Sequence, residues 1–134
     1  MVHGGLPSTE GVTLDEIKKI NRFCEPPERG LMADLLWSDF VNEDGYHPSK
    51  RGVSSAAGPD IASRFCEKNS IQLIVRSHEM KDEGYEMQRL GKVVTIFSAP
   101  NYCDQQKNKG AFIRFKAPEM KPEFSQFVAS VFVC

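Results

Sequence analysis

Three polar side chains of this sequence have the chemistry to bind a metal ion or a phosphate group: His3, Arg51 and His78. A neutral imidazole can bind a borderline metal ion, and the planar fork of a guanidinium suits bidentate contact with a phosphate. Two histidines do not make a metal site, because a zinc site typically needs further protein ligands and a two-metal site also needs bridging carboxylates. The residues alone therefore favour a plainer interpretation, in which His78 is a hydrogen-bonded histidine at a strand end and Arg51 is solvated.

Buried strands are expected to position these side chains. The segment from Ile71 to Val75 is short and rich in β-branched residues, which predicts a strand covered on both faces. Arg76 and His78 follow at the point where this strand would leave the core. The segment from Lys92 to Phe97 predicts a second buried strand, which leads into the loop Ser98 to Cys103. Functional residues collect on loops held by rigid elements, so both strand ends are candidate positions for a site.

Helices are predicted in the first half of the chain. The pattern T-x-x-E at Thr13 to Glu16 is a capping box that starts one helix. A second helix is expected from Gly30 to about Trp37, with the indole of Trp37 anchored in the core. A third starts at Gly58-Pro59, because proline is favoured at the first helical position, and Asn69 is expected as its left-handed cap.

The remaining segments are expected to be one long loop and several strands. The polar stretch from Asp39 to Gly52 is rich in turn formers and has no periodicity, which indicates a functional loop carrying Arg51. Strands are predicted at Tyr85 to Leu90, at Gly110 to Lys116 and at Phe124 to Cys134. Helices early and strands late predict an α+β fold with a mostly antiparallel or mixed sheet.

The composition is that of an ordinary globular protein. Of the 134 residues, 40% are hydrophobic and 26% are charged. The formal net charge is -1, with 17 Lys and Arg against 18 Asp and Glu, so no basic surface is expected for nucleic acid or an anionic membrane. A bound anion must therefore be met by local charges.

Cysteine spacing and the lack of targeting signals indicate the compartment. Four cysteines, Cys24, Cys66, Cys103 and Cys134, form no C-x-x-C pair and no zinc or disulfide spacing, which predicts free thiols in a reducing compartment. No apolar run is long enough for a membrane span, and the first residues do not resemble a signal peptide. A cytosolic or nuclear location is expected.

Five short motifs, in this order and spacing, resemble those of the phosphoprotein phosphatase family of serine/threonine phosphatases. They are HGGL at 3–6, LLWSD at 35–39, RGVS at 51–54, RSHE at 76–79 and SAPNYC at 98–103. The resemblance implies a calcineurin-like metallophosphoesterase fold, a four-layer α/β/β/α sandwich. Residues 1–134 would form the C-terminal part of its catalytic domain, and the two ends of the chain do not look like natural domain boundaries.

The resemblance also implies roles for individual residues. His3 and His78 match two ligands of one metal in a pair of divalent ions, either manganese, iron or zinc. Arg51 matches a residue that grips the substrate phosphate, and Tyr102 matches an aromatic residue that lines the site. Asp39 matches a position close to the site. The implied reaction is metal-assisted hydrolysis of phosphoserine and phosphothreonine esters in phosphoprotein substrates.

The sequence also departs from the family pattern. It lacks the family's D-x-H, G-D-x-x-D-R-G and G-N-H-E motifs, and Phe40 stands where proline usually follows WSD. The isolated chain is therefore expected to be inactive. One hypothesis is that it is part of a phosphatase domain; the other is a catalytically inactive fragment that acts as a protein-binding surface. One subfamily matches best, and its members carry a further repeat domain that binds chaperones.

Overall fold

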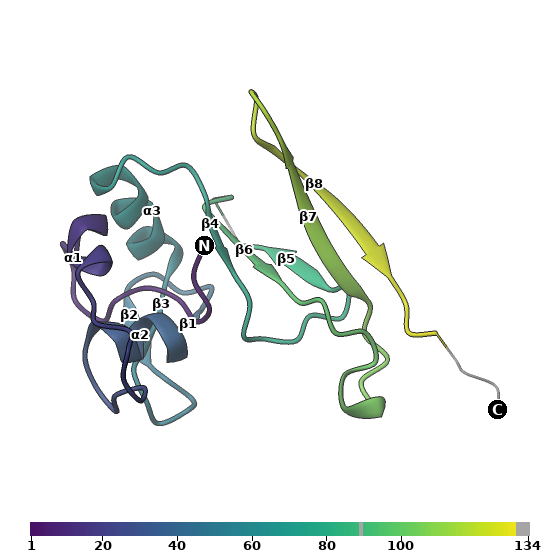
Figure 1. The fold of residues 1–134 in the computed structure, drawn as a ribbon, viewed down its shortest axis with the longest axis horizontal. Helices are drawn as coiled ribbons and strands as arrows, with labels where there is room; N and C mark the ends of the chain where they lie inside the picture. The colour runs from purple at the N-terminus through teal and green to yellow at the C-terminus, as the bar shows by residue number, and fades with distance from the viewer. Residues whose placement is uncertain (89, 131–134) are drawn as a thin grey trace. The chain divides into compact units, whose positions relative to one another are not determined.

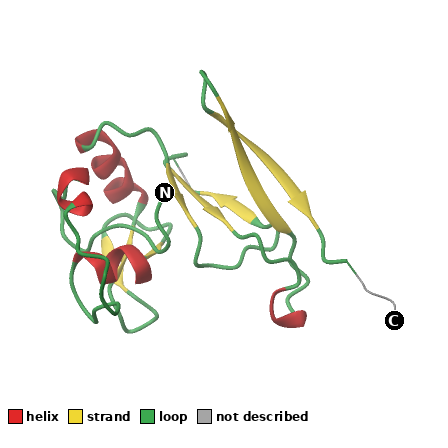
Figure 2. Ribbon diagram, viewed as in Figure 1, coloured by secondary structure: helices red, strands yellow, loops and turns green. Residues whose placement is uncertain are grey.

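The computed structural model describes residues 1–88 and 90–130, and these form two compact units. Unit 1 comprises Met1–Arg76 and Met87–Val94, and unit 2 comprises Ser77–Glu86 and the chain from Thr95 onwards. Figure 1 labels the elements along the chain. Figure 2 shows that the α-helices all come from the N-terminal part, whereas the C-terminal part is mostly strand and loop. The predicted α+β class is confirmed.

The helices of unit 1 begin where local signals predict. They are α1 (Leu14–Lys18), α2 (Leu31–Trp37) and α3 (Pro59–Lys68). The capping box is present, with the Thr13 side chain accepting from the Glu16 amide and the Glu16 carboxylate accepting from the Thr13 amide at 2.8 Å. Proline starts α3 as expected. No helix in the part of the chain that the structure describes has the length and apolar character needed to cross a membrane.

Two details of the helix predictions are wrong. Asn69 is not left-handed, since its φ is -97° and the positive φ falls on Ser70. Its side chain instead accepts a hydrogen bond from the Leu14 amide at 2.8 Å and donates to Val12 O, which ties α3 to the start of α1. Trp37, the last residue of α2, is 41% exposed rather than a core anchor.

The expected long loop at 39–52 contains short strands. These are β1 (Asp39–Phe40) and β2 (Tyr46–Pro48), which join β3 (Ser55–Ala57) in a sheet of order β1-β3-β2. β1 is parallel to β3, and β2 is antiparallel to it with Pro48 opposite Ser55. Residues 49–54 therefore form the loop of a hairpin. Strands this short have no periodicity of their own and form only through tertiary pairing.

Two buried strands are present as predicted, but the first begins at Ile74 rather than Ile71 and ends one residue later, at Arg76. β4 (Ile74–Arg76), β5 (Tyr85–Met87) and β6 (Val93–Ile96) form a sheet of order β4-β6-β5. Arg76 was expected where the strand leaves the core. It is instead the last residue of β4, and it is only 1% exposed. A buried guanidinium needs partners, and these are part of the site described below.

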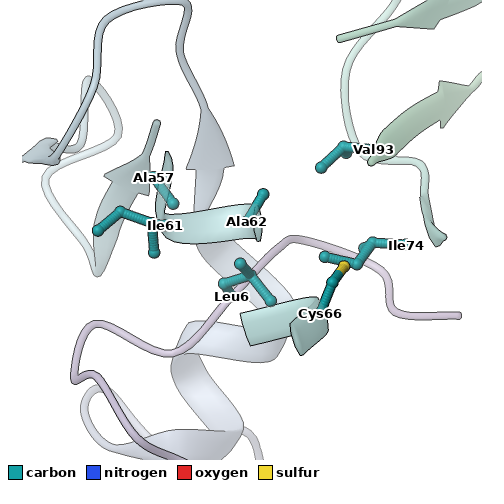
Figure 3. Close-up of a cluster of buried hydrophobic side chains, with 7 residues drawn as sticks. All are labelled: Leu6, Ala57, Ile61, Ala62, Cys66, Ile74 and Val93. Carbon is teal, nitrogen blue, oxygen red and sulfur yellow. The ribbon is translucent and has the colours of Figure 1, made fainter. Parts of the chain in front are cut away.

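The core of unit 1 is built around α3. Figure 3 shows its buried side chains, which come from the N-terminal segment, β3, α3, β4 and β6: Leu6, Ala57, Ile61, Ala62, Cys66, Ile74 and Val93. Burial raises the pKa of the Cys66 thiol, which keeps it protonated and inert. Cys24, Cys66 and Cys103 are free, and Cys134 lies outside the described residues.

Unit 2 contains a long antiparallel hairpin of β7 (Gly110–Lys116) and β8 (Lys121–Phe127). β7 matches its predicted bounds. The closing strand, predicted to run to Cys134, ends at Phe127, and residues 131–134 lie outside the described part of the chain. A Cβ on Gly84 would lie 2.7 Å from Gly110 C, so the segment after His78 lies directly against β7.

Candidate functional site

The carboxylate of Asp39 lies between two arginines of unit 1. Arg51 Nε donates to Asp39 Oδ2 at 2.7 Å, and Arg51 Nη2 donates to Oδ1 at 3.2 Å. Arg76 Nη2 donates to the same Oδ1 at 2.9 Å. The Asp39 side chain is 3% exposed, that of Arg76 is 0% exposed and that of Arg51 is 27% exposed. Only Arg51 of the three therefore reaches towards solvent.

Three different elements bring these side chains together. Asp39 begins β1, whose pairing with Ala56 of β3 fixes its backbone. Arg76 ends β4, and its Nε donates to Gly4 O at 2.5 Å. Arg51 lies in the hairpin loop 49–54, where its amide donates to Ser49 Oγ at 3.1 Å. Asp39 and Arg76 thus lie at strand ends, whereas Arg51 lies in a loop.

Phe40, the departure from the family pattern noted above, contacts the buried arginine. The guanidinium carbon of Arg76 lies 6.0 Å from the centroid of the Phe40 ring. A cation at this distance is attracted by the ring's negative face. The phenylalanine therefore adds a favourable contact to Arg76 that a proline could not supply.

The two arginines keep Asp39 ionised. Burial is the largest influence on this carboxyl and would raise its pKa, but the hydrogen bonds from Arg51 and Arg76 outweigh it and lower the pKa below the ordinary 3.8. Asp39 therefore carries a full negative charge at neutral pH. One carboxylate and two guanidiniums leave the trio, Asp39, Arg51 and Arg76, with a net positive charge.

This lowered pKa predicts a specific loss of stability in acid. An acid whose pKa is depressed by folding stabilises the protein above its unfolded pKa, and this stabilisation is lost as the pH falls through the lower, folded pKa. The difference in unfolding free energy between wild type and Asp39→Asn should stay constant from about pH 7 to about pH 5 and shrink below the ordinary value of 3.8. Urea titrations of both proteins across this range check it, and a constant difference at about pH 2 would contradict it.

His3 lies in unit 1 with its side chain exposed. The glycines that follow it allow the backbone to approach α2 closely. A Cβ on Gly4 would lie 2.6 Å from the Leu36 carbonyl, and the Gly4 amide donates to Leu35 O at 2.8 Å. These contacts fix the backbone next to His3 against the helix that leads to Asp39.

His78 and Tyr102 both belong to unit 2. His78 is partly buried and has a left-handed backbone with φ of 72°, which is uncommon for a residue with a side chain and costs energy. Tyr102 is 48% exposed, and its ring meets that of Phe97 edge-to-face at 5.1 Å. The contact with Phe97 therefore restrains the ring of Tyr102, and about half of the side chain stays accessible to solvent.

The loop that carries Tyr102 is held by a residue that the sequence did not single out. Asn108 is 4% exposed; its Oδ1 accepts from the Tyr102 amide at 2.8 Å and its Nδ2 donates to Ala99 O at 2.8 Å. Asn101 and Cys103 on either side of Tyr102 have left-handed φ values of 49° and 55°. Strained backbone of this kind persists only where surrounding contacts hold it.

The structure therefore brings together only part of the predicted site. It brings Arg51 and Arg76 to the same carboxylate, that of Asp39. The importance of Arg76 was missed in the sequence. The side chains in the described part of the chain include no group of three or more His, Cys, Asp or Glu residues placed to hold a metal ion. These residues by themselves do not form a metal centre, and the pairing of His3 with His78 stays a prediction.

Comparisons with known proteins show the family. The family model of the calcineurin-like phosphoesterases matches residues 1–82. The chain is 60% identical over 129 residues to serine/threonine-protein phosphatase 5 of Solanum lycopersicum, covering 96% of this chain and 23% of that protein. It is 52% identical over 129 residues to serine/threonine-protein phosphatase 5 of Homo sapiens, covering 96% and 26%.

A solved structure gives the same result. It is a protein serine/threonine phosphatase from Saccharomyces cerevisiae with similarity to human phosphatase PP5, at a TM-score of 0.87 and 39% identity, covering 98% of this chain and 44% of that one. The resemblance inferred from the motifs is confirmed. The chain spans only about a quarter of the length of the curated relatives, with 23% of the tomato protein and 26% of the human protein.

Proposed function

Because the chain belongs to the calcineurin-like phosphoesterase family, we propose that it takes part in the hydrolysis of phosphoserine and phosphothreonine esters in proteins. In this proposal Arg51 binds the substrate phosphate. The observation that carries it is the bidentate contact of Arg51 with Asp39 at 2.7 and 3.2 Å. The names of the relatives, serine/threonine-protein phosphatase 5, support the class of substrate.

The geometry around Arg51 favours binding of an anion in two ways. The contact with Asp39 fixes the orientation of the guanidinium, so less conformational entropy is lost when a phosphate binds. A lone Asp39 would cancel the charge of Arg51, but the Arg76 guanidinium at 2.9 Å compensates that carboxylate. Arg51 thus keeps a net attraction for a dianion while Asp39 holds it in place.

His3 and His78 are proposed to supply imidazole ligands to a divalent metal ion, and the family implies such ions. The described residues do not complete a metal centre, so the proposal needs further ligands beyond the described residues. Tyr102 is proposed to contact the substrate, and its 48% exposure is consistent with that role. The identity of the metal is left open between manganese, iron and zinc.

A chimera tests the proposed function. This chain would replace the matching stretch of the tomato phosphatase 5, with which it shares 60% identity over 129 residues. The chimera should hydrolyse a phosphoserine peptide with added manganese, and His78→Ala should abolish this activity. The isolated chain should hydrolyse an aryl phosphate negligibly under the same conditions.

Two outcomes would contradict the proposal. A folded, metal-loaded chimera without activity would favour the alternative, that the chain is inactive and acts as a protein-binding surface. Turnover by the isolated chain that is lost in His78→Ala would show that the chain needs no further ligands. Circular dichroism and metal analysis of each protein establish that it is folded and loaded before activity is compared.

A further inference from the structure

We infer that Asp34, through Ser54, is a positioning residue for Arg51, an inference that rests on the phosphate-binding role proposed above. Asp34 is 6% exposed. Its Oδ1 accepts from Ser54 Oγ at 2.6 Å, and its Oδ2 accepts from the amide and the hydroxyl of Ser8 at 2.8 and 2.7 Å. The Asp34 cluster, defined as Asp34, Ser8 and Ser54, thus joins α2 to the N-terminal segment and to the hairpin loop.

Ser54 is the residue at which this cluster holds the loop that carries Arg51. It is the last residue of loop 49–54 and directly precedes the Pro48–Ser55 pair that closes the hairpin. Its φ is 62°, a left-handed conformation that is unfavourable for a serine unless a local contact stabilises it. The short hydrogen bond to the ionisable, buried side chain of Asp34 is such a contact.

The backbone of α2 makes Asp34 a firm anchor. The Asp34 amide donates to Gly30 O at 3.0 Å, and Asp34 O accepts from the amide and the hydroxyl of Ser38 at 3.0 and 2.7 Å. Ser38 directly precedes Asp39, and it is fully buried. One rigid segment therefore presents both carboxylates, with Asp39 holding the Arg51 guanidinium and Asp34 holding the end of its loop.

Two contacts restrict the position of Arg51: its own contact with Asp39, and the contact of Ser54 with Asp34 at the end of its loop. With the Ser54 contact removed, the guanidinium can still reach Asp39, but the loop backbone behind it is free to shift. A loosened side chain loses more entropy when it captures an anion. The loss of a hydrogen bond to a charged group is expected to weaken phosphate binding at Arg51 by about tenfold.

The experiment uses the whole chain with arginine Nε labelled for NMR, and compares Ser54→Ala with Ser55→Ala. Ser55 is a matched control, because its buried Oγ has no hydrogen-bond partner among the described residues. The heteronuclear NOE of Arg51 Nε reports its order. Arg76 Nε, which donates to Gly4 O inside the core, serves as the internal reference. Inorganic phosphate is the titrated ligand, and Arg51→Lys assigns the signal.

The expected result is a lower NOE for Arg51 in Ser54→Ala, an unchanged NOE for Arg76, and phosphate binding about tenfold weaker than in wild type. Ser55→Ala should match wild type in all three. If Ser54→Ala does not fold, Ser54→Gly tests the same point, because glycine accepts the left-handed φ but lacks the hydroxyl.

The inference is overturned if the NOE of Arg51 is the same in the Ser54 variants as in wild type and Ser55→Ala. A failure of the proposed function looks different, since phosphate would then leave the Arg51 signal of the wild-type chain unmoved. The NOE comparison does not depend on phosphate. It therefore tests whether the Asp34–Ser54 contact positions Arg51 even if Arg51 does not bind phosphate.

Discussion

Asp39→Ala is expected to lower the free energy of unfolding by about 3–5 kcal/mol, the usual cost of removing one partner of a buried ion pair. The side chain of Arg76 is 0% exposed, so without Asp39 its positive charge would stay buried while the carboxylate at 2.9 Å is lost. Gly4 O and Ser38 O at 2.5 and 3.3 Å accept hydrogen bonds from Arg76 but carry no full charge. Urea denaturation followed by circular dichroism at neutral pH measures the effect.

Two further variants show whether the cause is the loss of the Asp39 carboxylate beside a buried guanidinium. Asp15→Ala is the matched control, because Asp15 also pairs with a cation, Lys18 at 3.0 Å, but both side chains are more than two-thirds exposed at 80% and 72%. Exposed pairs contribute little, so its effect should stay below about 1 kcal/mol. Combining Asp39→Leu with Arg76→Met should restore much of the stability, because an apolar pair leaves no buried charge. A loss of under about 1 kcal/mol in Asp39→Ala would contradict this account of the site.

Arg51→Ala in the chimera is expected to lower kcat/KM for a phosphoserine peptide by about 10²- to 10³-fold, the usual cost of removing one preorganised group that stabilises transition-state charge. Arg51→Lys should recover only a small part, because an ammonium group cannot reproduce the two hydrogen bonds to Asp39. Initial rates over a range of peptide concentrations separate an effect on KM from an effect on kcat.

Arg64→Ala is the control for this experiment. Arg64 likewise pairs with carboxylates, Glu10 at 2.6 Å and Asp60 at 2.9 Å, but its side chain is 53% exposed on α3 and these two acids are not part of the Asp39 trio. Its removal should leave kcat/KM within about threefold of the parent chimera. An Arg51→Ala chimera with unchanged kcat/KM would remove the phosphate-binding role from Arg51.

The two predictions also separate stability from catalysis. Arg51 is 27% exposed, so its loss leaves Asp39 with Arg76 as partner and should affect folding much less than the loss of Asp39. Asp39→Ala should impair both stability and activity, since it removes a carboxylate that contacts both arginines. Arg51→Ala should impair mainly activity.

The amino-acid sequence by itself determined the features that depend on residues close together in the chain. The capping box at Thr13 starts α1, proline starts α3, and the alternating segment at 110–116 forms β7 with its predicted bounds. The five motifs also identified the family and, through it, Arg51 as a candidate phosphate ligand. Each of these signals arises within one helical turn, one strand or one short motif, so no knowledge of packing was required.

Only the tertiary structure decided what holds Arg51. Asp39 and Arg76 are 37 positions apart, and Asp34 and Ser54 are 20 positions apart. No local pattern links such pairs, because their contact depends on how β1, β4, α2 and the hairpin loop pack. Arg76 shows the reason most clearly: the sequence placed it at the edge of the core, whereas a carboxylate and carbonyl oxygens from other segments allow its charge to be fully buried.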